Sequence, residues 1–447
     1  MGTTLPAGAR RGRRARGGVA ALAATGILAL VGCTDGAQQG APNASGPGSA
    51  TSSAVLAPTT DASAATSSTA TTSSAATTSS AATTSTATTA SATTTTSTAC
   101  PDRLVARLTP EQRVGQLLMV GIQPGQAPGG LDSTMRDQHV GGVIYLGGWN
   151  GSSVVTQTSA YLQGQATGSA SGGVRLFVAA DQEGGQVQQL KGSGFTTMPS
   201  ALSQGQSSQS SIEHNGATVG AELKRAGVNI DLAPVADTVP ADIGSANAPI
   251  GRYSRQFGDD PATVTRGVAA TIRGLAQGGV ASTVKHFPGL GRVSGNTDTT
   301  DTGITDDTAT TSDPFLAPFS DGVRAGAQLV MISSARYPKM DPANAAVFSP
   351  AVISGLLRGT LGYGGVVISD DLGAAKSVAA IPAGERAVRF VAAGGDIILT
   401  ATSSTAPAMT TALTARAAKD SAFAQKLDAS VRRVIALKVT MGLASCG

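Results

Sequence analysis

Short apolar runs rich in β-branched residues recur along the chain from residue 117 onward. Between most of them lie longer stretches rich in Ala, Leu, Arg and Gln, such as residues 263–277 and 350–361, which have the length and composition of helices. Strands that alternate with helices pair in parallel, because each strand needs a crossover connection to lie beside the next. The runs are Leu117–Ile122, Gly142–Leu146, Leu176–Ala180, Val228–Leu232, Ala281–Val284, Leu329–Ile332, Val366–Ile368 and Ile397–Leu399.

Eight strand–helix units predict an α/β fold, a single (β/α)8 barrel of the TIM type over residues 100–447. Its first helix is expected at Thr109-Pro110-Glu111-Gln112, which combines an N-cap residue, a proline at the first helical position and a glutamine three residues after the cap. An open doubly wound sheet is the alternative. It is disfavoured because polar motifs follow most of the runs instead of gathering at one crossover.

The amino-terminal segment has a different character. Five arginines between Arg10 and Arg16 precede the apolar residues 19–31, which are too few for a comfortable membrane span and are typical of a secretory signal. This stretch ends in Leu30-Val31-Gly32-Cys33, which resembles a bacterial lipobox. We therefore expect residues 1–32 to be a lipoprotein signal peptide and Cys33 to carry a lipid that anchors the protein to the cell membrane, outside the cytoplasm. An ordinary secretory signal, which would release the protein, and a twin-arginine signal are the alternatives.

Residues 33–99 are predicted to form a disordered tether. From about Ala41 to Ala99 the sequence is almost entirely Ser, Thr and Ala, without an aromatic residue and with hardly any charge. Such a segment cannot bury enough apolar surface to offset the entropy lost on ordering it.

The net charge limits which partners are expected, and the cysteines indicate an oxidising compartment. The formal net charge is +4, but the expected signal peptide holds five arginines and no acidic residue, so the remaining chain is near −1 and nucleic acid is not an expected partner. Apart from Cys33, the cysteines are Cys100 and Cys446, which bracket the predicted barrel. The ends of a closed barrel lie close together, so we predict a disulfide between them, with two free thiols as the alternative.

Charged side chains at the ends of several runs predict a functional pocket, because the carboxyl ends of barrel strands converge on one site. They are Asp181 and Glu183, Asp231 and Asp237, Lys285 and His286, and Asp370 and Asp371. His139, His214 and His286 are scattered along the sequence, so no metal site or cofactor is expected. The sequence also lacks the G-x-S-x-G elbow that would indicate a serine hydrolase. Carboxylates in a barrel mouth suit glycoside hydrolysis, in which one attacks the anomeric carbon and another protonates the leaving oxygen.

Several ordered motifs between about Leu104 and Leu443 resemble glycoside hydrolase family 3, in particular its β-N-acetylhexosaminidase branch. The resemblance implies that Asp370 is the covalent nucleophile and that Asp181, Arg255, Lys285 and His286 bind the sugar. The motifs are Asp181-Gln182-Glu183-Gly184-Gly185, Asp231-Leu232-Ala233-Pro234-Val235-Ala236-Asp237, Arg255-Gln256-Phe257-Gly258, Lys285-His286-Phe287-Pro288-Gly289 and Ser369-Asp370-Asp371-Leu372.

The chain departs from this family pattern at the proton donor. The branch usually has an Asp-Ser-His loop whose histidine serves as acid and base, but here the positions are Asn296 and Asp298. An aspartate can do the same work if burial or a neighbouring charge raises its pKa, so Asp298 is the expected acid/base. Two expected arginines are Gln186 and Gln189, and an expected histidine is Ser334, which favours a smaller or less anionic ligand.

The sequence is thus interpreted as a lipoprotein with one barrel, a retaining exo-β-N-acetylglucosaminidase that acts on cell-wall (peptidoglycan) fragments without a cofactor. Three alternatives stay open. A β-glucosidase of the same family would share the nucleophile. A phosphorylase would use phosphate in place of water, and a non-catalytic sugar-binding wall lipoprotein would have lost its acid/base.

Overall fold

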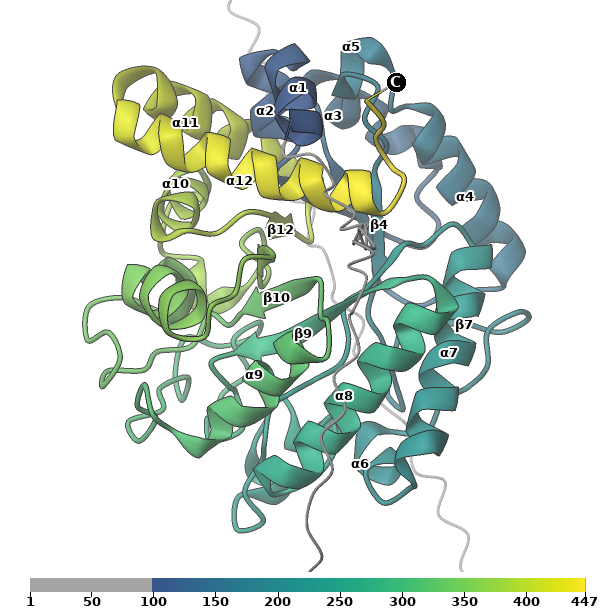
Figure 1. The fold of residues 1–447 in the computed structure, drawn as a ribbon, viewed down its shortest axis with the longest axis vertical. Coiled ribbons are helices and arrows are strands. Elements are labelled where there is room, and N and C mark those ends of the chain that lie inside the picture. Colours follow the sequence, from purple (N-terminus) through teal and green to yellow (C-terminus); the bar gives the residue numbers. More distant parts are fainter. Residues whose placement is uncertain (1–98, 447) are drawn as a thin grey trace, which may run out of the picture. The chain divides into compact units, whose positions relative to one another are not determined.

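The computed structural model describes residues 99–446 and arranges eight parallel strands as a nearly closed barrel with helices outside it (Figure 1). The strand order is β11, β10, β9, β8, β4, β2, β1, β12. A bridge between Ile368 and Ile397 connects the two ends of this order. The strands are β1 Leu118–Ile122, β2 Gly142–Tyr145, β4 Phe177–Ala180, β8 Ile230–Asp231, β9 Ala281–Phe287, β10 Leu329–Ile332, β11 Val366–Ser369 and β12 Ile398–Thr400.

Each predicted apolar run overlaps one of these strands, so the predicted α/β barrel is confirmed. Some boundaries were wrong, most of all that of β9: Lys285 and His286 lie inside this strand and not after it. The strand continues because the backbone of Lys285 stays hydrogen-bonded to the segment that follows β8. Its N–H donates to the carbonyl of Pro234 at 3.2 Å, and its carbonyl accepts from the N–H of Ala236 at 2.6 Å.

The helices cover the outside of the barrel, and α7 and α8 pack against each other (Figure 1). Thr109 caps α2 as predicted, because its side chain accepts from the N–H of Gln112. The helix expected at 350–361 is present as the π-helix η6, Ala351–Thr360. The α-helices are α1 Ala99–Arg107, α2 Pro110–Gly115, α3 Asp132–Asp137, α4 Ser152–Gly164, α5 Gly168–Ser171, α6 Ala201–Gln204, α7 Gln209–Arg225, α8 Pro261–Gly278, α9 Ala317–Arg324, α10 Ala383–Ala393, α11 Ala406–Lys419 and α12 Ser421–Thr440.

At the amino ends of the strands, side-chain amides bond to backbone groups that the sheet leaves open. Gln163 pairs with both backbone groups of Leu176, at 2.9 and 3.0 Å. Asn229 accepts from the N–H of Val178 at 2.9 Å, and Gln328 accepts from the N–H of Ser282 at 2.9 Å. Neutral amides therefore bond to the strand ends here, and Asp396, paired with Arg358 and Arg433, accepts from the N–H of Val367 at 2.8 Å in the same way.

The two ends of the described chain meet at this same side of the barrel. Helix α12 packs beside α1, and a disulfide joins Cys100 to Cys446, whose Cα atoms are 5.8 Å apart (Figure 1). Close by, the N–H of Arg175, just before β4, donates to the carbonyl of Leu443 at 3.0 Å.

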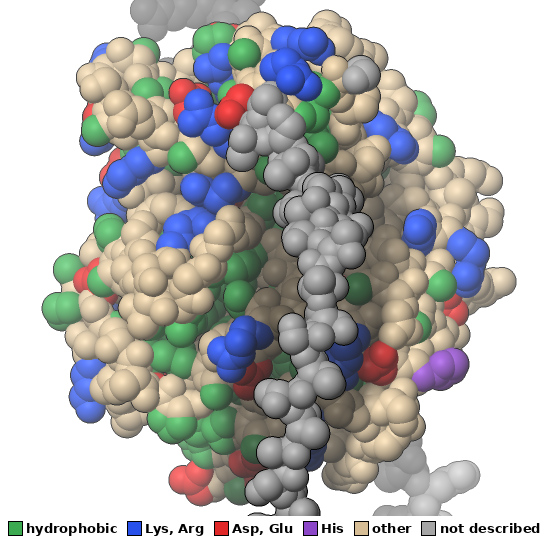
Figure 2. All heavy atoms as spheres, viewed as in Figure 1, with side chains coloured by type: hydrophobic (Ala, Val, Ile, Leu, Met, Phe, Trp, Pro, Cys, Tyr) green, Lys and Arg blue, Asp and Glu red, His purple; other side chains and the backbone are tan. Residues whose placement is uncertain are grey.

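The surface is mixed in character. On the face shown in Figure 2, lysine and arginine side chains are scattered among neutral and acidic ones and do not gather into one basic patch. Among residues 99–446, no helix combines the length and the apolar character that crossing a bilayer requires. The predicted signal peptide, the lipidated Cys33 and the tether lie outside the described residues.

Candidate active site

An open cavity of about 470 Å³ lies at the carboxyl ends of the strands. This volume is in the usual range for small-molecule sites. The cavity brings together every candidate catalytic and sugar-binding residue of the sequence analysis, namely Asp181, Arg255, Lys285, His286, Asp298 and Asp370. Residues far apart in the sequence therefore converge on one pocket.

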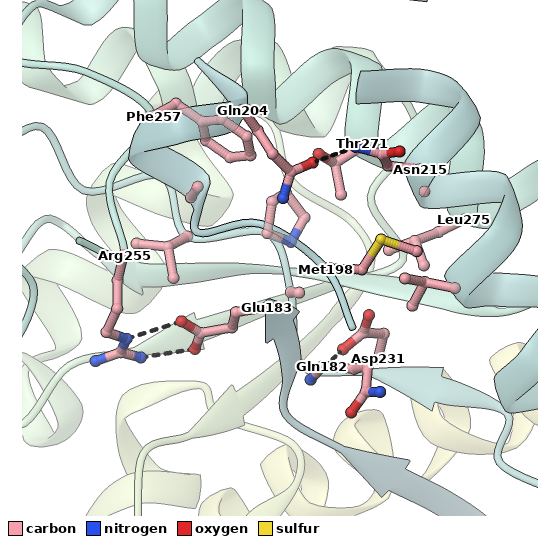
Figure 3. Close-up of a pocket in the computed structure, with 16 residues that line it drawn as sticks. Gln182, Glu183, Met198, Gln204, Asn215, Asp231, Arg255, Phe257, Thr271 and Leu275 are labelled. Atoms are coloured by element: carbon pink, nitrogen blue, oxygen red, sulfur yellow. Dashed lines mark hydrogen bonds and ion pairs between the residues drawn. The ribbon is translucent and has the colours of Figure 1, made fainter. Parts of the chain in front are cut away.

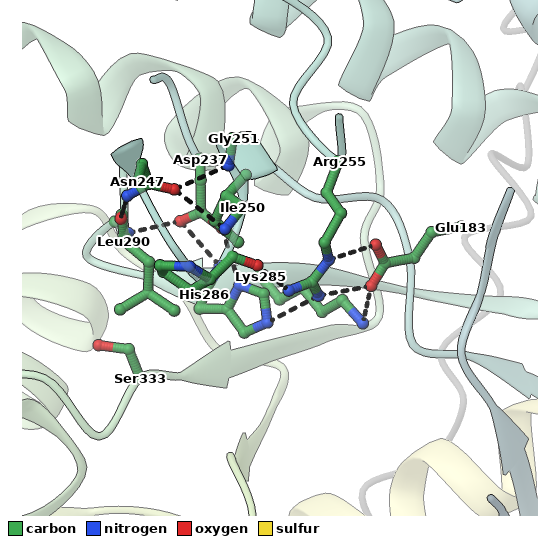
Figure 4. A network of polar contacts seen from close by, with 12 residues as sticks. Glu183, Asp237, Asn247, Ile250, Gly251, Arg255, Lys285, His286, Leu290 and Ser333 are labelled. Atoms are coloured by element: carbon green, nitrogen blue, oxygen red, sulfur yellow. Dashed lines mark hydrogen bonds and ion pairs between the residues drawn. The ribbon is translucent and has the colours of Figure 1, made fainter. Parts of the chain in front are cut away.

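A buried carboxylate, Glu183, connects the cationic side chains of this pocket (Figure 4). It accepts two hydrogen bonds from Arg255, at 2.7 and 2.8 Å, and forms an ion pair with Lys285 at 2.6 Å. Lys285 also lies 2.5 Å from Asp181. Burial alone would raise the pKa of Glu183, but Arg255 and Lys285 outweigh it and lower that pKa to about 2. Glu183 is thus a fixed anion that positions both cations.

His286 is held by a second buried carboxylate, that of Asp237 (Figure 4). The imidazole Nδ1 lies 2.7 Å from Asp237 Oδ2, and because an ionised carboxylate only accepts, Nδ1 carries the proton. The other oxygen of Asp237 accepts from the N–H of Leu290 at 2.7 Å. The ring is therefore oriented with Nε2 near Arg255 Nη2, at 3.4 Å.

Asp370 follows β11 directly, and its backbone N–H donates to the carbonyl of Ile332 at 3.0 Å. One carboxylate oxygen accepts from the N–H of Asp371 at 2.9 Å. Burial raises the pKa of Asp370, while attraction by His286 and Lys285 opposes that rise. The same cations favour the ionised form that a nucleophile needs.

Asp371 has a structural role. Its two oxygens accept from the backbone N–H groups of Gly373 at 2.7 Å, Ala374 at 2.9 Å and Ala401 at 2.9 Å. These bonds hold the turn after β11 against the end of β12. Asp371 thus positions the loop that carries Asp370.

Asp298 projects into the pocket from a loop that is attached to the chain after Asp371. The N–H of Lys376 donates to the carbonyl of Asp298, and the N–H of Ser377 to that of Thr297, both at 3.0 Å. Asp298 is exposed to the open pocket, and its closest charged neighbours include the carboxylates of Asp370 and Asp371. Desolvation, with repulsion from Asp370 and Asp371, raises its pKa to about 7.

The carboxylates of Asp298 and Asp370 titrate as a pair, because a proton bound to one changes the pKa of the other. The charged neighbours with the largest effect on the pKa of Asp298 are Asp370 and Asp371, which favour its protonated form. Those of Asp370 include His286 and Lys285, which favour its ionised form. Burial raises the pKa of both groups, and the cations beside Asp370 oppose that rise there, whereas the carboxylates beside Asp298 add to it. Water in the open pocket weakens the shift, and a bound sugar that displaces this water would strengthen it.

A second, small cavity of about 30 Å³ is lined by Glu183 and Arg255, among other residues (Figure 3). Asp231, which is 1% exposed, borders it. Its Oδ1 accepts from the N–H of Gln182 at 3.0 Å, whereas its Oδ2 has no hydrogen-bond partner among the described residues. Burial raises the pKa of Asp231 to about 8.

The roles of Glu183 and Asp237 were not predicted from the sequence. Both stand in motifs that were recognised in the sequence, and both follow predicted strands. Sequence position alone did not reveal that they lie under the pocket and bind the cations, because that depends on the direction of each side chain.

The remaining histidines lie outside the pocket network described above. His214 lies exposed on α7, and His139 Nδ1 lies 2.8 Å from the carbonyl of Ala170, so neither reaches the pocket. Within residues 99–446, no group of three or more His, Cys, Asp or Glu side chains is arranged to hold a metal ion.

Comparisons with known proteins agree with these motifs. The profile described as Glycosyl hydrolase family 3 N terminal domain matches residues 109–437. The Beta-hexosaminidase of Stenotrophomonas maltophilia is 36% identical over 233 residues, which cover 50% of this chain and 66% of that relative, just under two thirds of its length. Beta-hexosaminidase LpqI of Mycobacterium tuberculosis is 32% identical over 354 residues, covering 76% and 86%.

A solved structure is similar over nearly its whole length. The crystal structure of Beta-N-acetylhexosaminidase from Beutenbergia cavernae is 43% identical in sequence and superposes with a TM-score of 0.71. The match covers 74% of this chain and 99% of that one.

Proposed function

This chain belongs to glycosyl hydrolase family 3, and we propose that it is a retaining exo-β-N-acetylglucosaminidase. The observation that carries the proposal is the pair Asp298 and Asp370 in one pocket: neighbouring carboxylates favour a protonated Asp298, and Lys285 and His286 attract the carboxylate of Asp370. An acid and a nucleophile of this kind are what retaining glycoside hydrolysis requires. The names of the similar proteins support N-acetylhexosamine as the sugar.

In the first step, Asp370 attacks the anomeric carbon, and the bond from that carbon to the leaving oxygen breaks. Asp298 donates its proton to the leaving oxygen. In the second step, water attacks the anomeric carbon of the glycosyl-enzyme, Asp298 takes the proton of that water, and Asp370 departs as a carboxylate. Two displacements at one carbon retain its configuration.

The sugar would be held by Asp181, Arg255, Lys285 and His286. Each lies in the pocket wall, and each is fixed by a buried partner or by another member of the network. Charged groups make stronger hydrogen bonds to hydroxyls than neutral groups do, and groups held in advance lose less entropy when the sugar binds.

Hydrolysis is preferred over phosphorolysis on electrostatic grounds. A phosphate ion that attacks the glycosyl-enzyme would have to approach Asp371 and Asp298, which has given its proton to the leaving group, and both line the pocket. Like charges at such distances repel, whereas water carries no charge.

The test is a panel of 4-nitrophenyl β-glycosides with the full chain, with and without phosphate. We expect turnover of the N-acetylglucosaminide, little of the glucoside, and free sugar instead of sugar phosphate as product. Asp370→Ala should abolish turnover, because no covalent intermediate can form. Asp371→Asn should cost far less. Equal losses in these two variants, or a sugar phosphate product, would contradict the proposal.

We also propose that the protein is anchored through a lipid on Cys33 and acts on cell-wall fragments outside the cytoplasm. The support is the lipobox-like Leu30-Val31-Gly32-Cys33 after a short apolar segment. Cys33→Ala should release the protein from the membrane fraction. Unchanged membrane association of that variant would contradict the anchor.

A further inference from the structure

We infer that this pocket selects against leaving groups that carry a free negative charge, so that its substrates are glycans in which N-acetylglucosamine is linked to a neutral or cationic sugar. The inference rests on the proposed function and narrows its substrate class. It depends on how the charges that line the pocket are paired.

Every side chain of the pocket wall that can carry positive charge already has an anionic partner. Arg255 is paired with Glu183, Lys285 with Asp181 and Glu183, and His286 with Asp237. Each of these cations is at most 14% exposed. None of them is left free to receive a carboxylate from a ligand.

The wall carries more negative than positive charge. Four carboxylates line it, namely those of Asp181, Asp298, Asp370 and Asp371, against the cations Arg255 and Lys285 and the imidazole of His286. Glu183 adds another anion directly beneath them, and the lowered pKa of Glu183 keeps it ionised. Even with Asp298 protonated, the described part of the pocket has no excess of positive charge.

Among residues 99–446, the rest of the pocket lining contributes no charge. Its remaining polar side chains are those of Gln186, Gln189, Tyr253, Asn296 and Thr297. Gln189 Oε1 is already used, because it accepts from the N–H of Gly148 at 3.0 Å. Gln186 is exposed. A leaving group that brings a carboxylate near these amides finds hydrogen bonds but no counter-ion, while the carboxylates of the pocket repel it.

The rejected class includes sugars with a free lactyl carboxylate, such as unsubstituted N-acetylmuramic acid, so the proposed cell-wall substrates are those in which this carboxylate is uncharged in an amide bond. The favoured class includes N-acetylglucosamine as the leaving sugar and, more so, glucosamine, whose ammonium group the carboxylates attract. We expect the specificity constant kcat/KM to rise in the order anionic, neutral, cationic.

The matched test compares β-1,4-linked N-acetylglucosaminyl-N-acetylmuramic acid with its methyl ester, which has the same shape without the charge. We expect kcat/KM for the ester to exceed that for the acid about 10-fold or more at low ionic strength, and the ratio to shrink as salt screens the repulsion. N,N′-diacetylchitobiose serves as the neutral reference. Equal constants for acid and ester at low salt would overturn the inference.

A gain-of-charge variant sharpens the result. Gln186→Arg places a cation in the pocket wall, and Gln186→Met is the uncharged control of similar length. We expect the ester-to-acid ratio to fall several-fold in Gln186→Arg and to stay at its wild-type value in Gln186→Met. The same fall in both variants would contradict an electrostatic origin.

The 4-nitrophenyl N-acetylglucosaminide separates this inference from the proposed function. If that activated glycoside is not hydrolysed, the catalytic proposal fails. The acid and the ester would then be compared by calorimetric binding to the wild-type chain, where equal affinities would overturn the inference.

Discussion

Two fully buried lysines, at opposite ends of the barrel, have opposite surroundings. Lys285 at the mouth is 1% exposed and lies between Asp181 and Glu183. Burial lowers the pKa of Lys285, but the two carboxylates outweigh that effect and raise it. Lys438 on α12 is 0% exposed and donates to Gln116 Oε1 and to the carbonyl of Gly141, both at 2.7 Å. Its other close neighbour is the ring of Phe177, and burial lowers its pKa to about 7.

The difference shows what each end of the barrel is built for. At the mouth, charges are buried with counter-charges, which is costly unless every member is bonded, and the result is a rigid charged surface for a ligand. At the opposite end, a lysine with only neutral acceptors serves the packing of α12 and gives no ligand a counter-ion. Changes at the mouth should therefore alter turnover, and changes at the far end should alter stability and its dependence on pH.

The largest effect is expected from Asp298→Ala. Substrates with poor leaving groups should slow by about 10²- to 10⁴-fold, the range for lost general acid catalysis. Activated aryl glycosides should be spared in the first step, and azide, which needs no base, should rescue their turnover. Asp301→Ala, an exposed residue of the same loop, is the control. Equal activity toward both substrate classes and no azide effect would exclude Asp298 as the acid/base.

The pH profile of the wild type tests the same residue. Asp298 donates only when protonated, and its pKa is raised to about 7. Hydrolysis of poor leaving groups should therefore fall as the pH rises through about 7. A profile flat from pH 6 to 9 for these substrates would contradict the assignment.

The second largest effect is expected from Glu183→Gln, which removes the buried anion at the mouth of the barrel. It leaves Arg255 and Lys285 with a neutral amide, and breaking a buried ion pair costs about 3–5 kcal/mol. We expect a lower free energy of unfolding and a higher KM in the same variant. Glu213→Gln is the control, because its pair with Arg273 is far more exposed, at 26% and 40%. A change in unfolding free energy no larger than in this control would show that Glu183 is not central.

Removal of the Cys100–Cys446 disulfide tests whether the end of the barrel opposite the pocket contributes to stability and not to turnover. The bridge closes a loop of 346 residues, and the Cys100→Ser/Cys446→Ser double variant should lose about 2–5 kcal/mol of unfolding free energy. The kcat on an activated glycoside should hardly change, because the bridge lies at the end opposite the pocket. A large fall in kcat at a temperature where the variant is folded would contradict this separation.

Lys438→Met should change the slope of stability against pH. The pKa of Lys438 is about 7 in the folded chain and about 10.4 when unfolded, so the unfolded state binds more protons between these values. Stability from this residue is complete above about pH 10.4 and is lost, by at most about 1.4 kcal/mol per unit, as the pH falls toward 7. Denaturant titrations of wild type and variant at several pH values should show this slope only in the wild type.

Asp231→Asn should have the smallest effect. With its pKa raised to about 8, folded Asp231 is protonated near neutral pH, and an asparagine keeps both its shape and the bond from Gln182 N–H. Turnover at pH 6 should stay close to that of the wild type. The wild-type folded state binds more protons between about pH 4 and 8, so its stability falls with rising pH in that window, and the variant should lack this fall. A strong loss of activity in Asp231→Asn would show that the charge is needed.

Much of the fold and several site residues were predictable from local patterns. The apolar runs located all eight strands, because a strand buried on both faces needs a continuous apolar segment whatever its partners are. Thr109 and Gln112 marked the start of α2, because capping depends on neighbours in the sequence. Asp181, Lys285, His286 and Asp370 were placed in one predicted pocket because the ends of barrel strands converge, whereas Arg255 and the proposed roles came from the family resemblance.

Only the tertiary structure decided how these residues act on one another. The length of β9, the carboxylates Glu183 and Asp237 beneath the cations, and the pairing that leaves no free positive charge all depend on which segments meet in space. The same holds for the two lysines, which look alike in the sequence. Burial sets the cost of a charge and nearby partners set its compensation, and both are fixed only when residues far apart in the chain are brought together.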